Sequence, residues 1–213
     1  MTEQDKLLTV VVIGLNEENC LQACFDSIAK STRNSFDIEI IYVDSGSVDA
    51  SLEIAKSNKD VKLLHLDTPQ PSAAKARNRG IKEAAGKYIQ FIDGDCSLYQ
   101  EWLAEAINFL EAEIEYTCVF GNIVEKEPDK NFYTKVCARD WYIEPGEYRL
   151  CGGNSMWRRL DLLDLQGFDD SIGLGEEPDL CYRARQKGLK LYCLGKEMVL
   201  HDLEMNSFRD YWN

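Results

Sequence analysis

The sequence of 213 residues is poor in positive charge and in histidine and has no long apolar run. It has 24 lysine and arginine residues against 37 aspartate and glutamate residues, which gives a formal net charge of −13. Such a surface repels nucleic acid unless basic residues cluster, and here they do not. The longest apolar run, residues 7–15, is far shorter than the roughly 20 residues of a bilayer-spanning helix. We therefore expect no nucleic-acid partner and no transmembrane segment.

Signals for export and for disulfide bonding are also missing. Residues 1–6 carry acids where a signal peptide carries basic residues, and the apolar run after them lacks a small-residue cleavage site. The eight cysteines form no CxxC pair and lie mostly in apolar segments, as buried thiols of a reducing compartment do. We predict a cytoplasmic protein without a disulfide framework or a zinc knot.

The first 121 residues alternate apolar runs with amphipathic segments. The predicted strands cover residues 7–15, 38–43, 61–66, 87–92 and 116–120, and the predicted helices cover residues 19–30, 52–55, 71–85 and 101–113. Strands that alternate with helices pair in parallel through right-handed crossovers. The expected fold is therefore a three-layer α/β/α sandwich with a mostly parallel central sheet.

The alternation breaks after Gly121. A polar stretch, residues 125–130, leads into an aromatic-rich segment, residues 132–142. A short helix is predicted after Trp157, and another over residues 178–187, with Pro178 as its first helical residue. Because neither a repeat nor a linker separates the two parts, we expect one domain.

Acids stand at the predicted strand ends where nucleotide-binding folds often have glycines. The first strand-to-helix turn has Gly14 but lacks the further glycines of a nicotinamide or flavin site, and no Gly-Lys-Ser/Thr phosphate loop is present. Ligands of open α/β sheets bind beyond the carboxyl ends of the strands, where this sequence has Glu17, Asp44, Asp93 and Asp95. Acids that face a polyphosphate need a divalent cation between them and the ligand.

Asp93 and Asp95 suit such a cation. They are two residues apart at the end of a predicted strand and are expected to point to one side, and Gly94 leaves room for a ligand. Asp-Gly is also a common turn dipeptide, so a solvated turn is the alternative. Asp44, a third acid in the same crevice, favours the ligand site.

Arg77 lies near the middle of the apolar face of the predicted helix 71–85. An unpaired buried guanidinium costs several kcal/mol, so the side chain needs a carboxylate or a ligand. Arg77 either extends to water at the edge of the sheet or reaches the crevice, where it meets Asp44 or a nucleotide base.

Acids also cluster at the start of the predicted helix 178–187. The positive end of the helix dipole favours the ionised form of a carboxylate there, as a general base requires, although an acidic first turn can serve the dipole alone. His201 follows an apolar run. Two roles fit this position, a metal ligand and a buried histidine whose ring nitrogens are hydrogen-bonded.

Five segments of the chain together resemble the family 2 glycosyltransferases of the GT-A fold. They are VIGLNEE (12–18), VDSGSVD (43–49), ARNRG (76–80), FIDGD (91–95) and GLGEEPDL (173–180). The resemblance covers nearly the whole chain and implies one GT-A domain over residues 1–213. A nucleotide-binding half would extend to about residue 121, and an acceptor and catalytic half would follow.

The activity implied by the resemblance is transfer of a sugar, with inversion, from a nucleotide-diphosphate donor to a hydroxyl acceptor. A UDP-sugar is the expected donor, and polysaccharide, glycolipid or cell-surface glycan synthesis is the expected setting. The implied donor-binding residues are Glu17, Asp44, Arg77, Asp93, Gly94 and Gly153. Asp95 would bind Mn²⁺ or Mg²⁺ on the diphosphate, and His201 resembles the distal metal ligand of some members.

Glu177 aligns with the general base of the family, which is usually Asp in a Glu-Asp pair. Glu176 and Asp179 therefore stay candidates for the base. A nucleotide-sugar-binding module without transfer activity is one alternative function. A haloacid-dehalogenase-type phosphatase with Asp93 as nucleophile is another, although its Asp-x-Asp motif follows the first strand, whereas here it follows the fourth.

The C-terminal residues resemble the start of a helix that the chain does not complete. Ser207 and Asp210 form a capping-box pattern, but the sequence ends at Asn213, so we expect a C-terminally truncated chain. In the resembled family, such downstream segments often complete the acceptor site or touch the membrane. A lipid-linked acceptor and peripheral association with the inner face of the membrane are therefore open.

Overall fold

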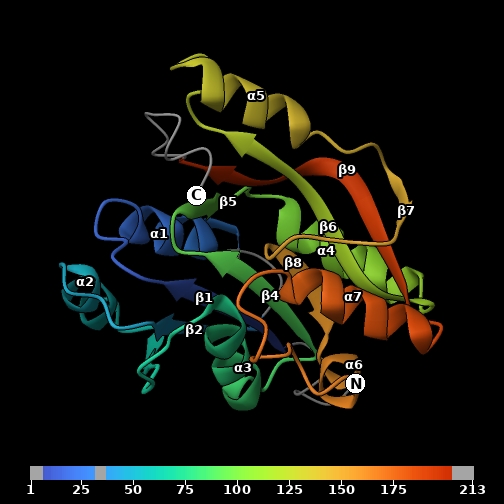
Figure 1. The fold of residues 1–213 in the computed structure, drawn as a ribbon, viewed down its shortest axis with the longest axis horizontal. Coiled ribbons are helices and arrows are strands. Elements are labelled where there is room, and N and C mark those ends of the chain that lie inside the picture. The colour runs from blue at the N-terminus through green and yellow to red at the C-terminus, as the bar shows by residue number, and fades with distance from the viewer. Residues whose placement is uncertain (1–6, 32–36, 203–213) are drawn as a thin grey trace.

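The computed structural model describes residues 7–31 and 37–202, which form one nine-stranded sheet with helices on both faces (Figure 1). Its strands are β1 (Leu7–Gly14), β2 (Asp37–Asp44), β3 (Val61–His65), β4 (Tyr88–Asp93), β5 (Cys96–Leu98), β6 (Tyr116–Glu125), β7 (Gly146–Tyr148), β8 (Ser155–Arg158) and β9 (Lys190–His201). Their order is β3-β2-β1-β4-β8-β6-β9-β5, with β7 paired to β9. The predicted capping box at Ser207 and Asp210 lies outside the described residues.

Six of the nine strands run in the same direction. β1 to β4 pair in parallel, β8 is antiparallel to both β4 and β6, and β9 is parallel to β6. β6 and β9 therefore run as β1 to β4 do, and only β5, β7 and β8 run the opposite way. The predicted α/β fold with a mostly parallel central sheet is confirmed.

Shared strand direction brings acidic residues far apart in the chain to one edge of the sheet. In register, Gly14 of β1 lies beside Asp44, and Ile13 lies beside Asp93. At the same edge, β6 ends at Glu125, which is paired with His201 at the end of β9. The carboxyl ends of five strands thus provide the polar residues of the candidate site.

The helices cover the two faces of the sheet. They are α1 (Leu21–Ser31), α2 (Ser51–Ser57), α3 (Ala73–Glu83), α4 (Trp102–Ala112), α5 (Phe132–Asp140), α6 (Arg159–Asp164) and α7 (Glu176–Gln186). Gly80 of α3 packs against Val11 of β1, whereas Trp102 of α4 donates a hydrogen bond to Gln90, which points to the opposite face (2.8 Å). Figure 1 shows α3 and α7 on the near face, with α4 behind β6.

In the second half of the chain, α7 and α5 differ from the sequence prediction. α7 begins at Glu176 instead of Pro178, after Gly175 in the left-handed conformation (φ 98°). Pro178 is tolerated inside the first turn because the N–H groups there have no partner within the helix. α5 was not predicted, since its apolar pattern is weak. Every helix in the part of the chain that the structure describes is too short or too polar to span a bilayer.

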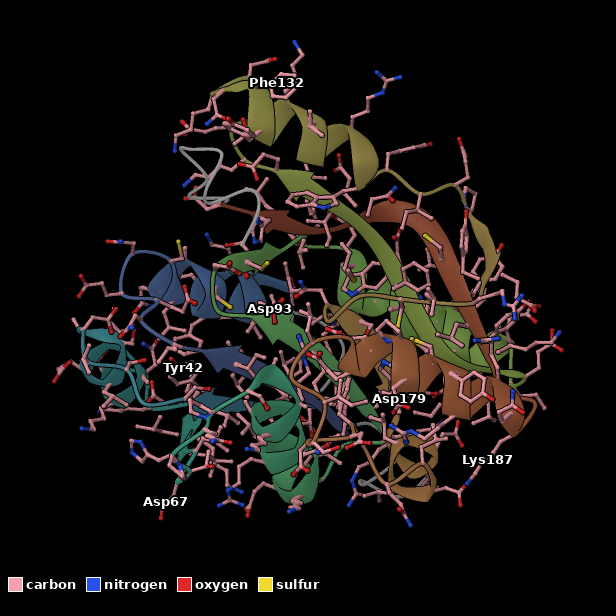
Figure 2. All side chains as sticks on the ribbon, in the orientation of Figure 1. Tyr42, Asp67, Asp93, Phe132, Asp179 and Lys187 are labelled. Carbon is pink, nitrogen blue, oxygen red and sulfur yellow. The ribbon has the colours of Figure 1, made fainter. Side chains whose placement is uncertain are left out.

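The second half of the sheet was mostly missed. β5, β7 and β8 are three or four residues long, too short for a clear period, and Gly195 and Lys196 interrupt the apolar pattern of β9. These strands matter for the site because β5 pairs with β9 so that Cys96 lies beside His201. Figure 2 shows Asp93 near the middle of the molecule, while Asp67, Phe132 and Lys187 lie at its periphery.

Candidate functional site

A cavity of about 320 Å³ lies at the carboxyl ends of β1 and β4, as the sequence predicts. Its volume is within the roughly 300 to 1,000 Å³ of small-molecule sites. It is lined by Ile13, Gly14, Leu15, Glu17, Ser45, Pro71, Ser72, Ala73, Asp93 and Asp95. A larger cavity, of about 540 Å³, lies between α3 and α6, but Arg183 within it is bound to Asp179 and to backbone carbonyls. The acid-lined cavity is therefore the candidate site.

Glu17 lies over two glycines at the ends of neighbouring strands. Its Cγ would be 2.9 Å from a Cβ at Gly14 and 3.0 Å from one at Gly94, so a side chain at either position would require Glu17 to shift. Burial, followed by the charge of Asp95, raises the pKa of Glu17 to about 7. Near neutral pH this carboxyl can donate a hydrogen bond as well as accept one, which suits it to a ligand hydroxyl.

Asp44 stabilises the loop that follows β2. Its Oδ2 accepts hydrogen bonds from the backbone N–H groups of Gly46 (2.9 Å) and Ser47 (3.0 Å), and the residue is buried. The predicted contact between Arg77 and Asp44 is wrong, because this carboxylate turns toward its own loop. An Asp that precedes Ser-Gly is a recognised turn signal. Contact of Asp44 with a ligand base stays a prediction.

Arg77 is the centre of a buried ionic cluster that joins three elements. Its guanidinium lies 3.2 Å from Oδ1 of Asp93, 3.0 Å from Oε1 of Glu176 and 3.0 Å from Oε1 of Glu177. The side chain is only 4% exposed, and its guanidinium also lies 5.5 Å from the centre of the Phe168 ring. Burial disfavours the charged form, but the three carboxylates outweigh it and raise the pKa of Arg77. The predicted need for a carboxylate partner is confirmed.

The loop before β8 fixes this cluster in place. A Cβ at Gly153 would overlap Nη2 of Arg77 and lie 3.1 Å from Oε1 of Glu177. Asn154 donates from Nδ2 to Oδ2 of Asp93 (3.1 Å) and accepts from the backbone N–H of Asp93 (3.0 Å). Both oxygens of Asp93 are therefore held by protein groups.

Sequence reasoning did not identify Asn154. The only local signal was its position after Gly152 and Gly153. The structure also corrects the expected orientation of Asp93 and Asp95: both line the cavity, but Asp93 faces Arg77 and Asn154, whereas Asp95 faces His201. Gly94 and Asp95 form a turn, which breaks the alternation of a strand.

The three candidates for a general base differ in their surroundings. Glu176 is buried, and its Oε2 accepts a hydrogen bond from the N–H of Gly175 (3.1 Å). Asp179 is paired with Arg183 (2.7 Å). Glu177 keeps a partly exposed side chain, and burial raises its pKa against the opposing effect of Arg77. Glu177 is therefore the candidate that combines a partly exposed side chain with a raised pKa.

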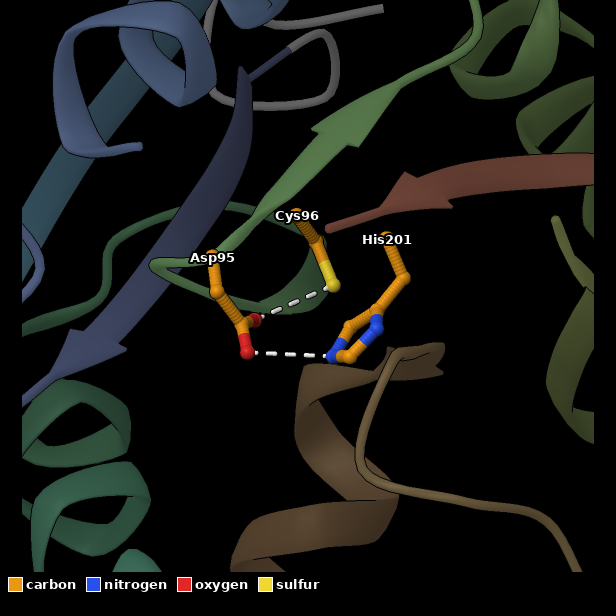
Figure 3. Close-up of side chains that lie close together, drawn as sticks. All are labelled: Asp95, Cys96 and His201. Carbon is orange, nitrogen blue, oxygen red and sulfur yellow. Dashed lines mark hydrogen bonds and ion pairs between the residues drawn. The ribbon is translucent and has the colours of Figure 1, made fainter. Parts of the chain in front are cut away.

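Asp95, Cys96 and His201 present three possible metal-binding atoms within 4.8 Å of one another (Figure 3). Nε2 of His201 lies 3.0 Å from Oδ2 of Asp95, and the Cys96 thiol donates to Oδ1 of Asp95 (3.3 Å). Nδ1 of His201 lies 3.7 Å from Oε2 of the buried Glu125. The histidine is thus held between two carboxylates.

Charge and burial act in opposite directions in this group. Burial favours the neutral forms of both Asp95 and His201. Their mutual hydrogen bond and attraction outweigh it, so the pKa of Asp95 is lowered and the pKa of His201 is raised. A carboxylate oxygen suits both Mn²⁺ and Mg²⁺, whereas an imidazole nitrogen is more typical of transition metals than of Mg²⁺, so the oxygen of Asp95 and the nitrogen of His201 fit a divalent cation.

The chain matches known glycosyltransferases. The family model described as glycosyl transferase family 2 matches residues 9–159. Glycosyltransferase GlyA of Streptococcus pneumoniae serotype 4 is 33% identical over 98% of this chain and 32% of GlyA. Glycosyltransferase AglE of Haloferax volcanii is 33% identical over 51% of this chain and 36% of AglE. The chain therefore spans about a third of the length of these two relatives.

Solved structures show the same fold. The crystal structure of S. aureus TarS in complex with UDP-GlcNAc has a TM-score of 0.75 and 20% identity, covering 94% of this chain and 59% of that one. TarS in complex with UDP has a TM-score of 0.74 and 19% identity, covering 96% and 62%. This likeness confirms the expected GT-A fold.

Proposed function

Since the chain belongs to glycosyl transferase family 2, we propose that it transfers a sugar, with inversion, from a nucleoside-diphosphate donor to an acceptor hydroxyl. The observation that carries this proposal is the acid-lined cavity, whose wall includes Asp93, paired with Arg77, and Asp95, paired with His201. UDP-GlcNAc and UDP bound to TarS support a UDP-sugar as the donor. Polysaccharide, glycolipid or cell-surface glycan synthesis is the proposed setting.

The residues of the cavity would bind the donor nucleotide. Glu17, with its raised pKa, would hydrogen-bond a ribose hydroxyl over Gly14 and Gly94. Asp93 would lie beside the ribose or the sugar, oriented by Asn154. Arg77 already has three carboxylate partners, so its proposed role is to position Asp93 and the start of α7, with no direct contact to the base.

Asp95 and His201 would hold the cation, Mn²⁺ or Mg²⁺, with Glu125 behind the histidine. When bound, the cation supplies positive charge that stabilises the departing nucleoside diphosphate. The nitrogen ligand of His201 favours Mn²⁺ over Mg²⁺.

Glu177 would take the proton from the attacking acceptor hydroxyl. Its raised pKa makes it a better proton acceptor than an ordinary exposed carboxylate, and Arg77 keeps it in place. Attack on the face opposite the leaving diphosphate inverts the anomeric carbon, as in inverting glycosidases. Glu176 is too tightly bound to Arg77 and Gly175 for the same role.

Of the two alternative functions, the observations argue against the phosphatase but not against the binding module. The family match argues against the phosphatase, in which Asp93 would be the nucleophile; here both oxygens of Asp93 accept hydrogen bonds from Arg77 and Asn154. A nucleotide-sugar-binding module without transfer keeps every contact described above. Only turnover separates this module from an enzyme.

Calorimetry and donor turnover test the proposal. UDP is titrated into the protein with Mn²⁺ and with EDTA, and UDP release is followed from UDP-, GDP- and dTDP-sugars. We expect Mn²⁺-dependent binding and release in the wild type and loss of both in Asp95→Asn. The control Asp164→Asn removes an exposed carboxylate of α6 and should leave both intact. UDP binding without UDP release from any donor would favour the binding module. If the wild type and Asp95→Asn each bind UDP equally well in Mn²⁺ and in EDTA, Asp95 is not a metal ligand.

A further inference from the structure

Another cavity, of about 360 Å³, lies on the β6 and β9 side of the acid-lined cavity. Most of its wall is apolar. Its main lining side chains are Phe120, Ile123, Trp141, Ile143, Leu150 and Met198. They come from β6, from β9 and from the segments on either side of β7, which run beside β9 and back across β6 (Figure 1).

Three contacts connect this cavity to the candidate active site. Asn154 lines it and holds Asp93. Gly152 also lines it and directly precedes Gly153, which lies against Arg77 and Glu177. The ring of Trp141 packs edge-on against His201, with 5.3 Å between the ring centres. A molecule in the cavity would therefore lie next to both halves of the site.

The wall offers few polar groups to an occupant. Among the described residues that line it, the polar side-chain groups are the indole N–H of Trp141, the thiol of Cys151 and the amide of Asn154. Both ends of the Asn154 amide are already bonded to Asp93. Sugar hydroxyls or phosphates buried here would lack partners, and each unpaired polar group costs free energy. The chemistry of the wall therefore selects an apolar group.

We propose that this cavity binds an aryl or short alkyl group of the acceptor, next to the hydroxyl that reacts. This inference rests on the proposed glycosyl transfer and names the class of acceptor: a hydroxyl compound with a hydrophobic body, in place of a free polar sugar. Trp141 and Met198 provide the contact surface, and the Gly152–Gly153 loop directs the hydroxyl toward Glu177.

Gly152 allows the cavity to be filled without disturbing the fold. A Cβ at this residue would have no atom within 4 Å, in contrast to Gly153. Because Gly152 is exposed and lines the cavity, Gly152→Leu should fold normally while its side chain narrows the cavity. Leu150 and Leu160 form a matched pair: both are at least half exposed, but Leu150 lines the cavity and Leu160 lies on α6.

The experiment compares phenyl β-glucoside with methyl β-glucoside by saturation-transfer NMR on the whole chain. We expect the phenyl compound to bind about tenfold more tightly than the methyl compound, since a buried ring adds apolar contact. This preference should disappear in Gly152→Leu and weaken in Leu150→Ala, but persist in Leu160→Ala. Equal binding of the two glucosides to the wild type, or a preference unchanged in Gly152→Leu, would overturn the proposal.

A parallel measurement separates this proposal from the proposed function. UDP affinity in the presence of Mn²⁺ is measured in the same variants and should be unchanged, because the acid-lined cavity is not altered. If the wild type does not bind UDP in the presence of Mn²⁺, the glycosyltransferase proposal itself is contradicted. Intact UDP binding without a phenyl preference would contradict only the acceptor cavity.

Discussion

Gly153 lies directly against the guanidinium of Arg77, so close that a Cβ at residue 153 would overlap Nη2. An arginine end group usually moves aside at little cost. Here Asp93, Glu176 and Glu177 hold it in a buried position. The glycine is therefore required by the ionic cluster, and the two features can be tested together.

Gly153→Ala should push Arg77 away from its partners. Breaking a buried ion pair costs roughly 3 to 5 kcal/mol, so we expect a loss of about 3 kcal/mol in the free energy of unfolding, measured by urea denaturation. Gly152→Ala is the matched control and should unfold at the wild-type urea concentration, because its Cβ meets no atom within 4 Å. Equal stability of the two variants would show that Arg77 moves freely.

Glu177→Gln should lower turnover by about a hundredfold or more while UDP affinity stays close to that of the wild type, as loss of a general base requires. Initial rates of transfer and UDP calorimetry check this. Glu176→Gln should lower stability as well, since Glu176 is buried against Arg77. If Asp179→Asn shows the hundredfold loss instead, the base is Asp179 and its pairing with Arg183 does not persist during turnover.

Glu17 should make stability depend on pH. Its pKa in the folded protein, about 7, is above the ordinary 4.5, so its stabilising contribution is complete below about pH 4.5 and lost as the pH rises through 7. Glu17→Gln removes this titration. The variant should therefore gain stability relative to the wild type between about pH 5 and pH 8, by about 1 kcal/mol, because solvent weakens the effect at a carboxyl that is only partly buried. Urea denaturation in EDTA measures the difference, and a constant difference across this range would contradict the raised pKa.

Gly80 allows α3 to pack closely on β1. A Cβ there would overlap Cγ1 of Val11, so Gly80→Ala should cost roughly 1 to 3 kcal/mol of unfolding free energy through overpacking. Val11→Ala removes the obstructing methyl groups and leaves a cavity. In the double variant the new methyl group fills that space. Its loss of unfolding free energy should therefore be smaller, by at least about 1 kcal/mol, than the two single losses added together. Additive losses in a double-mutant cycle would contradict this packing.

The first half of the fold and much of the site were predictable from the sequence. β1 to β4 are mainly apolar segments that end in turns, and a parallel sheet brings such ends to one edge. Glu17, Asp93 and Asp95 were expected around one crevice on this basis, and they line the cavity. The need of Arg77 for a carboxylate followed from its place on an apolar helix face.

The partners of these residues were decided by the tertiary structure alone. Arg77 meets Glu176 across 99 positions of sequence, and His201 meets Asp95 because β5 pairs with β9. Local periodicity records which face of an element is buried, but holds no information on which element covers it. Asp44 shows the same limit, since its acidity was evident whereas its bonds to its own loop were not. The sequence by itself determined that acids collect at one edge of a parallel sheet. The packing of α7, β8 and β9 decided which side chain each acid faces, because these contacts join segments far apart in the chain.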